Sequence, residues 1–160
     1  MANELGQWLG IIIILGLLIA VYRELGAILE PSKSAHDGPP LGTRLPASVR
    51  NAAPLKTDHL SVFVGVVTEG CSVCERFLAN LERSNAELQN FNVILVAKAA
   101  TTRYVSELGR LGVRVIVDET GDLTRALNVH ATPLILTADR DWRVLRKGVT
   151  HRVRDFIGAG

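Results

Sequence analysis

The sequence predicts an α/β fold, a mixed sheet with flanking helices, preceded by one N-terminal transmembrane helix. From residue 60 onward, β-branched runs alternate with helix-prone stretches, which is typical of strands joined by crossover helices. Near the N-terminus, residues 5–22 are almost purely apolar. We therefore divide the 160 residues into an anchor with its juxtamembrane segment (1–30), a linker (31–54) and one domain (55–160).

The apolar run at 5–22 has about the minimum length for a helix that crosses a bilayer. Trp8 and Tyr22 lie near its ends, where aromatic side chains are typical of the membrane interface. A cleaved signal peptide is a second interpretation, but no basic residue precedes the run. A buried core helix is a third, but the run has no polar face. Arg23 and Lys33 follow the run, and the positive-inside rule alone would place the domain in the cytoplasm.

Residues 31–54 have the composition of a linker. Five of the six prolines fall in this range, together with glycine, serine and charges of both signs. Such a segment buries too little apolar surface to offset the entropy lost on ordering. We expect a semi-rigid spacer whose second half lies along the surface of the domain.

The domain itself is expected to follow the order β-α-β-α-β-α-β-β-α. The expected segments are strands at 60–68, 91–97, 113–117, 134–137 and 142–149, and helices at 71–89, 102–111, 121–127 and 151–157. Apolar residues near helical spacing define the first helix, Gly112 ends the second, and Asp122 lies near the start of the third. Crossover helices imply a parallel core, and the hairpin that turns at 138–141 adds an antiparallel edge.

The only two cysteines, Cys71 and Cys74, lie between the first strand and the first helix of the domain. Unpaired N–H groups and the helix dipole at a helix N-terminus favour the thiolate of the first cysteine. The second cysteine lies on the same helix face, within reach of a disulfide bond. We therefore predict a redox-active dithiol in which Cys71 is the nucleophile and Cys74 resolves the mixed disulfide.

Other interpretations of the cysteine pair are less well supported. A purely structural disulfide would close a very small loop and add little stability, and two thiols buried in the core would have no chemistry. A zinc site needs four ligands, and the four histidines supply no second pair at zinc-finger spacing. A thiolate pair suits Cu(I), but no methionine cluster accompanies it. We expect no metal and no cofactor besides a Cys71–Cys74 disulfide. The net charge of +2 and an aromatic content of 5% predict no nucleic-acid binding.

The sixth proline, Pro133, stands alone at the start of the strand at 134–137. A trans proline on an edge strand is the commoner case, since about 5–6% of X–Pro bonds are cis. Behind a CxxC pair in this order of elements, we expect a cis bond that turns the Thr132 backbone toward the dithiol. Thr132 and Pro133 are then predicted to bind the backbone of a client polypeptide.

These elements together carry a resemblance to a known family. Residues 60–157 resemble a thioredoxin fold, with Cys71 and Cys74 as the active-site pair and Thr132-Pro133 as the cis-proline element. The apolar run and the segments 22–30 and 38–46 are similar to membrane-anchored thioredoxin-like proteins of the MauD and TlpA type. The resemblance implies a thiol-disulfide oxidoreductase in the inner membrane, with a single span and the domain on the periplasmic side. Its partners would be client protein thiols and disulfides, and a MauD-like role would be the maturation of a partner enzyme, methylamine dehydrogenase.

The chain also departs from the thioredoxin pattern. Gly70 replaces the tryptophan that often precedes the first cysteine, and no proline lies between the cysteines. Gly65 stands where thioredoxins carry a buried acid that assists proton transfer to the resolving thiol. Glu69 has two interpretations, a substitute base acting through water or a solvated loop charge.

The missing acid also fits an alternative function without catalysis. The chain would then be an accessory or assembly subunit of a membrane protein complex that has a thioredoxin-like shape. Gly10 and Gly16 would let its anchor approach neighbouring helices closely.

Overall fold

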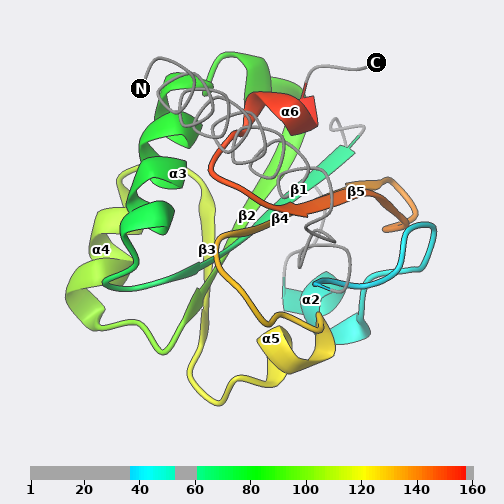
Figure 1. The fold of residues 1–160 in the computed structure, drawn as a ribbon, viewed down its shortest axis with the longest axis horizontal. Coiled ribbons are helices and arrows are strands. Elements are labelled where there is room, and N and C mark those ends of the chain that lie inside the picture. Colours follow the sequence, from blue (N-terminus) through cyan, green and yellow to red (C-terminus); the bar gives the residue numbers. More distant parts are fainter. Residues whose placement is uncertain (1–36, 53–60, 158–160) are drawn as a thin grey trace, which may run out of the picture. The chain divides into compact units, whose positions relative to one another are not determined.

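The computed structural model describes residues 37–52 and 61–157 (Figure 1). The predicted transmembrane helix at 5–22 lies outside these residues, as does the junction between the linker and the domain. Within the two described ranges, no helix is both long enough and apolar enough to cross a membrane.

A five-stranded mixed sheet forms the centre of the domain. Its strands are β1 (Ser61–Thr68), β2 (Phe91–Lys98), β3 (Arg114–Asp118), β4 (Leu134–Asp139) and β5 (Val144–Val149), in the order β3-β2-β1-β4-β5. Parallel pairing joins β1 to β2 and β2 to β3, whereas β4 runs antiparallel to both β1 and β5. The predicted parallel core with an antiparallel hairpin is therefore confirmed. The dithiol follows β1, the central strand.

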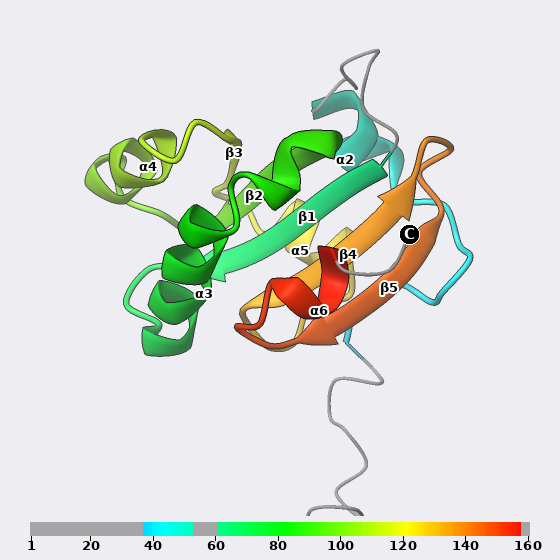
Figure 2. The same ribbon diagram turned by 90° about the horizontal axis from the view of Figure 1, so that it is seen from above.

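Helices cover both faces of this sheet. They are α2 (Ala47–Ala52), α3 (Ser72–Arg83), α4 (Thr102–Gly109), α5 (Asp122–Ala126) and α6 (Arg154–Ile157), with a 3₁₀ turn, η2, at Glu87–Asn90. Figure 1 shows α2 and α5 on one side of the sheet and α3 and α6 on the other, and Figure 2 shows the same layers from above. The arrangement places α3, which carries the cysteines, directly against the centre of the sheet.

Alternate residues along the strands supply the two cores, since successive strand side chains point to opposite faces. Val62, Val64 and Val66 of β1 pack with residues of α2 and α5, whereas Phe63 and Val67 pack with α3 and α4. Because β1 is buried on both faces, its sequence is a nearly continuous run of apolar residues. Cys74 belongs to the second of these cores.

The first predicted helix ends earlier than its apolar spacing indicated. It was expected to reach residue 89, but α3 ends at Arg83 and its C-cap residue Ser84 is buried. Serine and asparagine at 84 and 85 favour turns because their side chains compete for backbone hydrogen bonds. Leu88 still reaches the core, but from the 3₁₀ turn η2.

The second half of the predicted linker is part of the domain core. Leu45 and Val49 are 1% and 0% exposed and pack against the sheet. The N–H of Leu45 donates to the carbonyl of Trp142 (2.8 Å), and the N–H of Val144 donates to the carbonyl of Thr43 (2.9 Å). The expectation of a spacer therefore does not hold for residues 37–52, because burial of their few apolar side chains offsets the ordering entropy that composition alone suggested.

Candidate active site

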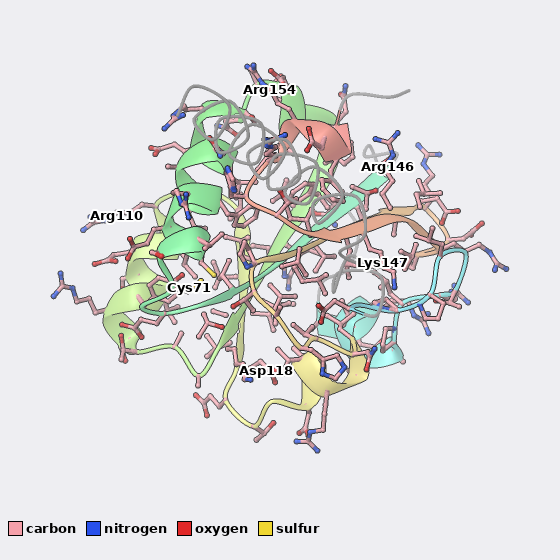
Figure 3. The ribbon with its side chains drawn as sticks, in the orientation of Figure 1. Cys71, Arg110, Asp118, Arg146, Lys147 and Arg154 are labelled. Atoms are coloured by element: carbon pink, nitrogen blue, oxygen red, sulfur yellow. The ribbon has the colours of Figure 1, made fainter. Side chains whose placement is uncertain are left out.

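The end of β1 delivers the cysteine pair to the start of α3. Gly70 has a φ of +74°, a left-handed conformation that glycine adopts without steric cost, and it turns the chain from strand to helix. Cys71 is the N-cap residue of α3, and its Sγ accepts a hydrogen bond from the N–H of Cys74 at 3.2 Å. Figure 3 shows Cys71 at this end of α3. Both cysteines are free thiols, so the pair is in its reduced form.

Cys71 has the environment of a nucleophilic thiol. Its partial burial would raise the pKa, but hydrogen bonds from the side chain and N–H of Cys74, the Thr132 side chain and the N–H of Val73 act in the opposite direction. The balance lowers the pKa of Cys71 below that of an ordinary thiol. Because its side chain is also partly exposed, the thiolate is accessible from solvent.

Cys74 has the opposite environment. Burial, followed by hydrogen bonding to Cys71, raises its pKa to about 11. The side chain is fully buried, in the same apolar cluster as Phe77 and Leu108. At neutral pH the pair therefore consists of a reactive outer thiol and a protonated inner thiol.

The Thr132–Pro133 bond is cis, as expected, and lies beside the dithiol. The Sγ of Cys71 lies 3.8 Å from the carbonyl oxygen of Thr132, and the hydroxyl of Thr132 lies 3.3 Å from that of Thr68 at the end of β1. Pro133 is buried at the start of β4. The structure thus brings all four predicted site residues together from the start of α3 and the loop before β4.

Gly65 has no room for a side chain. A Cβ atom at this position would lie 2.8 Å from Cζ of Phe77 and 2.9 Å from Cδ2 of Leu95. The Phe77 ring, which stacks on Phe63 with centroids 6.4 Å apart, fills the place that an acid would need. The packing between α3 and the sheet therefore leaves no space for an acidic side chain at position 65.

Glu69 is exposed in the loop before Cys71, as the interpretation of a solvated loop charge expects, and it also has specific partners. Its carboxylate accepts hydrogen bonds from the N–H and the hydroxyl of Thr101, both at 2.8 Å. Thr101 is the N-cap residue of α4, so Glu69 ties the loop before Cys71 to the start of that helix. These hydrogen bonds lower the pKa of Glu69, which makes it a poor base at neutral pH.

Tyr104 on α4 is a residue near the site that sequence reasoning missed. Its side chain is buried in the same cluster as Cys74, and its hydroxyl has no hydrogen-bond partner. Burial, with the nearby cysteines and glutamates, raises its pKa to about 12. Nothing in the local sequence distinguishes this tyrosine from an ordinary amphipathic helix residue.

A groove of about 520 Å³ runs between α3 and α4 and begins beside Gly70. Leu78 and Leu108 contribute to its lining, and Glu69 and Glu75 are among the charged residues around it. Among residues 37–52 and 61–157, no group of three or more histidine, cysteine or acidic side chains is placed to hold a metal ion.

Several solved structures have a similar fold, and some of them are named as thiol-disulfide proteins. The thioredoxin domain of a thiol-disulfide oxidoreductase from Bacteroides vulgatus matches with a TM-score of 0.55 at 14% identity, over 75% of this chain and 99% of that one. A thiol:disulfide interchange protein from Bacteroides sp. matches with a TM-score of 0.53 at 12% identity, over 78% and 91%. StoA from Bacillus subtilis matches with a TM-score of 0.51 at 12% identity, over 61% and 77%. No protein-family model and no curated protein matches the chain.

The comparisons define the fold as thioredoxin-like, the fold of proteins named as thiol-disulfide oxidoreductases. At these identities the likeness establishes the architecture alone. What the chain does with that architecture has to be argued from the geometry around Cys71.

Proposed function

We propose that the chain is a thiol-disulfide oxidoreductase that acts on client proteins through Cys71 and Cys74. The observation that carries the proposal is the asymmetry of the pair. Cys71 is partly exposed with a lowered pKa, and Cys74 is buried with a pKa raised to about 11. A structural disulfide does not require its two cysteines to differ in exposure and pKa. Thiol-disulfide exchange, in contrast, requires an accessible thiolate and a shielded second thiol.

Starting from the reduced pair, the Cys71 thiolate attacks one sulfur of a client disulfide. A bond forms between Cys71 and the client, and the second client sulfur leaves as a thiolate. Cys74 then loses its proton and attacks Sγ of Cys71, which releases the first client sulfur. The client has gained two electrons and the chain has lost two. Starting from the disulfide form, the reverse sequence oxidises a client dithiol.

The resemblance of the N-terminal sequence supports a more specific form of the proposal. In it, residues 5–22 anchor the chain in the inner membrane, and the domain acts on extracytoplasmic clients in the maturation of a partner enzyme. Labelling of Cys71 with a membrane-impermeant maleimide in intact spheroplasts tests the topology. Labelling before lysis would support it, and labelling only after lysis would place the domain in the cytoplasm.

A redox titration of the 160-residue chain tests the activity, with the two thiols trapped by alkylation and counted by mass spectrometry. A reversible two-electron couple is expected. A potential near −270 mV would indicate a reductant, and one near −120 mV an oxidant. Cys71→Ser should abolish exchange, whereas Cys74→Ser should accumulate a mixed disulfide between Cys71 and the client. Exchange at the wild-type rate in Cys71→Ser would refute the proposal.

The packing under Gly65 favours one alternative, a thioredoxin-like accessory subunit without catalysis. Phe77 and Leu95 fill the place of an acid that would accept the proton of Cys74. In that case the chain would co-purify with a membrane complex in mild detergent. The activity of that complex would be the same for wild type and Cys71→Ser.

A further inference from the structure

A buried carboxylate at the start of the described chain is joined to the loop that leads into Thr132. Asp37 is 3% exposed, and its Oδ1 accepts hydrogen bonds from the backbone N–H groups of His130 (2.7 Å) and Ala131 (3.1 Å). The N–H of the next residue, Gly38, donates to the carbonyl of Asn128 at 2.9 Å. Three hydrogen bonds therefore connect residues 37–38 with a loop more than 85 positions later.

The loop at 128–131 depends on this acceptor. It lies between α5 and β4, outside any helix or strand, and Asn128 has a φ of +52°. The backbone N–H groups of His130 and Ala131 both point to one oxygen of Asp37, as consecutive N–H groups do around an anion. Without that oxygen, two backbone donors at the edge of the core would lose their acceptor.

Ala131 is followed directly by Thr132, whose carbonyl oxygen lies 3.8 Å from Sγ of Cys71. Thr132 is held from the other side by the hydroxyl of Thr68. It also contributes to the low pKa of Cys71 through its side chain. A shift of the loop would therefore move both the backbone that faces a client and a group that stabilises the thiolate.

We propose that Asp37 is a positioning residue for thiol-disulfide exchange, which holds the loop at 128–131 so that Thr132 stays in place beside Cys71. This inference rests on the proposed function of the dithiol. It assigns a role near the reaction to a segment that the composition of the sequence places in a linker. Asp37 does not touch the reacting sulfur atoms, and it acts only through the two N–H groups that it binds.

The test compares Asp37→Ala and Asp37→Asn in the 160-residue chain. Asparagine keeps an oxygen that accepts both N–H groups, whereas alanine removes it. Asp118→Ala is the matched control, because Asp118 is also 3% exposed and its carboxylate also accepts from two consecutive backbone N–H groups, those of Leu123 and Thr124. Among the described residues, the side-chain hydrogen bonds of Asp118 go to the start of α5 and not to the N–H groups of residues 130 and 131.

The first readout is the rate of Cys71 alkylation by iodoacetamide at pH 7. Asp37→Ala should lower it roughly threefold, because a displaced Thr132 no longer supplies a hydrogen bond that lowers the Cys71 pKa, and the thiolate fraction falls. The second readout is reduction of insulin relative to reduction of the small aromatic disulfide DTNB. The insulin rate should fall further than the DTNB rate, because only a polypeptide pairs with the Thr132 backbone. Asp37→Asn should restore both readouts, and Asp118→Ala should change neither.

The inference is overturned if Asp37→Ala matches wild type in both readouts, or if Asp118→Ala lowers them equally. If Asp37→Ala does not fold, the role of Asp37 is tested by backbone amide hydrogen exchange in the wild-type protein. Protected amides at His130 and Ala131 support the role, and exchange at unprotected rates refutes it. If wild type reduces neither insulin nor DTNB, the proposed function fails, while alkylation and hydrogen exchange still decide on Asp37.

Discussion

The substitution Gly65→Ala tests how tightly the space beneath the dithiol is filled. The added Cβ would lie 2.8 Å from Cζ of Phe77 and 2.9 Å from Cδ2 of Leu95. Ordinary carbon–carbon contacts are about 3.5–4.0 Å, so both contacts would be too short by roughly 0.6 Å or more. Phe77 and Leu95 are fully buried and have little room to move. Overpacking of this kind costs about 1–3 kcal/mol in the free energy of unfolding.

Urea denaturation of the reduced protein measures this cost. Gly65→Ala should lower the midpoint while leaving the slope m unchanged, since the surface exposed on unfolding is the same. The matched control is Gly109→Ala at the end of α4, where an added Cβ has nothing within 4 Å. That control should be neutral or stabilising, by up to about 1 kcal/mol, because alanine loses less backbone entropy than glycine.

A double-mutant cycle with Phe77→Leu identifies the source of the cost. Leucine lacks the distal ring atoms that a Cβ at position 65 would meet, so Gly65→Ala should cost less in the Phe77→Leu background. A coupling energy of about 0.5–2 kcal/mol is expected for residues in direct contact. The reasoning is refuted if Gly65→Ala changes stability by less than about 0.5 kcal/mol, or if the two substitutions are additive.

Four further outcomes follow from the site. Alkylation of the reduced protein at pH 8 should modify Cys71 and leave Cys74 unmodified, as mass spectrometry would show; equal labelling of both would contradict the assigned pKa directions. The pKa of Cys74 is raised in the folded state, so its stabilising contribution is complete below pH 9 and is lost as the pH rises toward 11. Cys74→Ser should flatten this loss in denaturation experiments, and an unchanged pH profile would refute it. Tyr104→Phe removes a buried hydroxyl without a partner, so stability should stay constant or rise by up to about 1 kcal/mol. A clear loss in a urea titration would reveal a hidden partner. Glu69→Ala should speed amide exchange at Thr101, while Cys74 still releases a client from its mixed disulfide with Cys71 at the wild-type rate; slower release would reinstate Glu69 as a base.

The sequence predicts the sheet well because its signals are local. β1 and β2 are runs of β-branched residues buried on both faces, and the order of strands and helices limits the sheet to a few topologies. The position of Cys71 at a helix N-terminus can likewise be inferred from a strand, a glycine and a helix in succession. The early end of α3 was missed because apolar spacing continues through Leu88 although the backbone has already turned.

Contacts between distant parts of the chain could not be inferred in the same way. Asp37 lies in a proline-rich stretch, and nothing near it indicates a partner 93 positions later. The same holds for Leu45 and Val49, which look like isolated apolar residues until Trp142 and the sheet cover them. Composition describes how a segment behaves alone, whereas burial depends on what the rest of the fold presents to it.

The packing under Gly65 and the chemistry of Cys74 are two consequences of one arrangement. The apolar face of α3 that buries Phe77 also buries Cys74, and burial is the main reason that the Cys74 pKa rises to about 11. An acid placed at Gly65 would meet the same Phe77 ring, so it cannot be introduced without loosening the contact that holds α3 to the sheet. In the absence of that acid, the proton of Cys74 has to leave by another route, to water or to the departing client thiolate. The resolving step of the proposed exchange should therefore accelerate as the pH rises, since the thiolate is the attacking species and burial raises the pKa of Cys74.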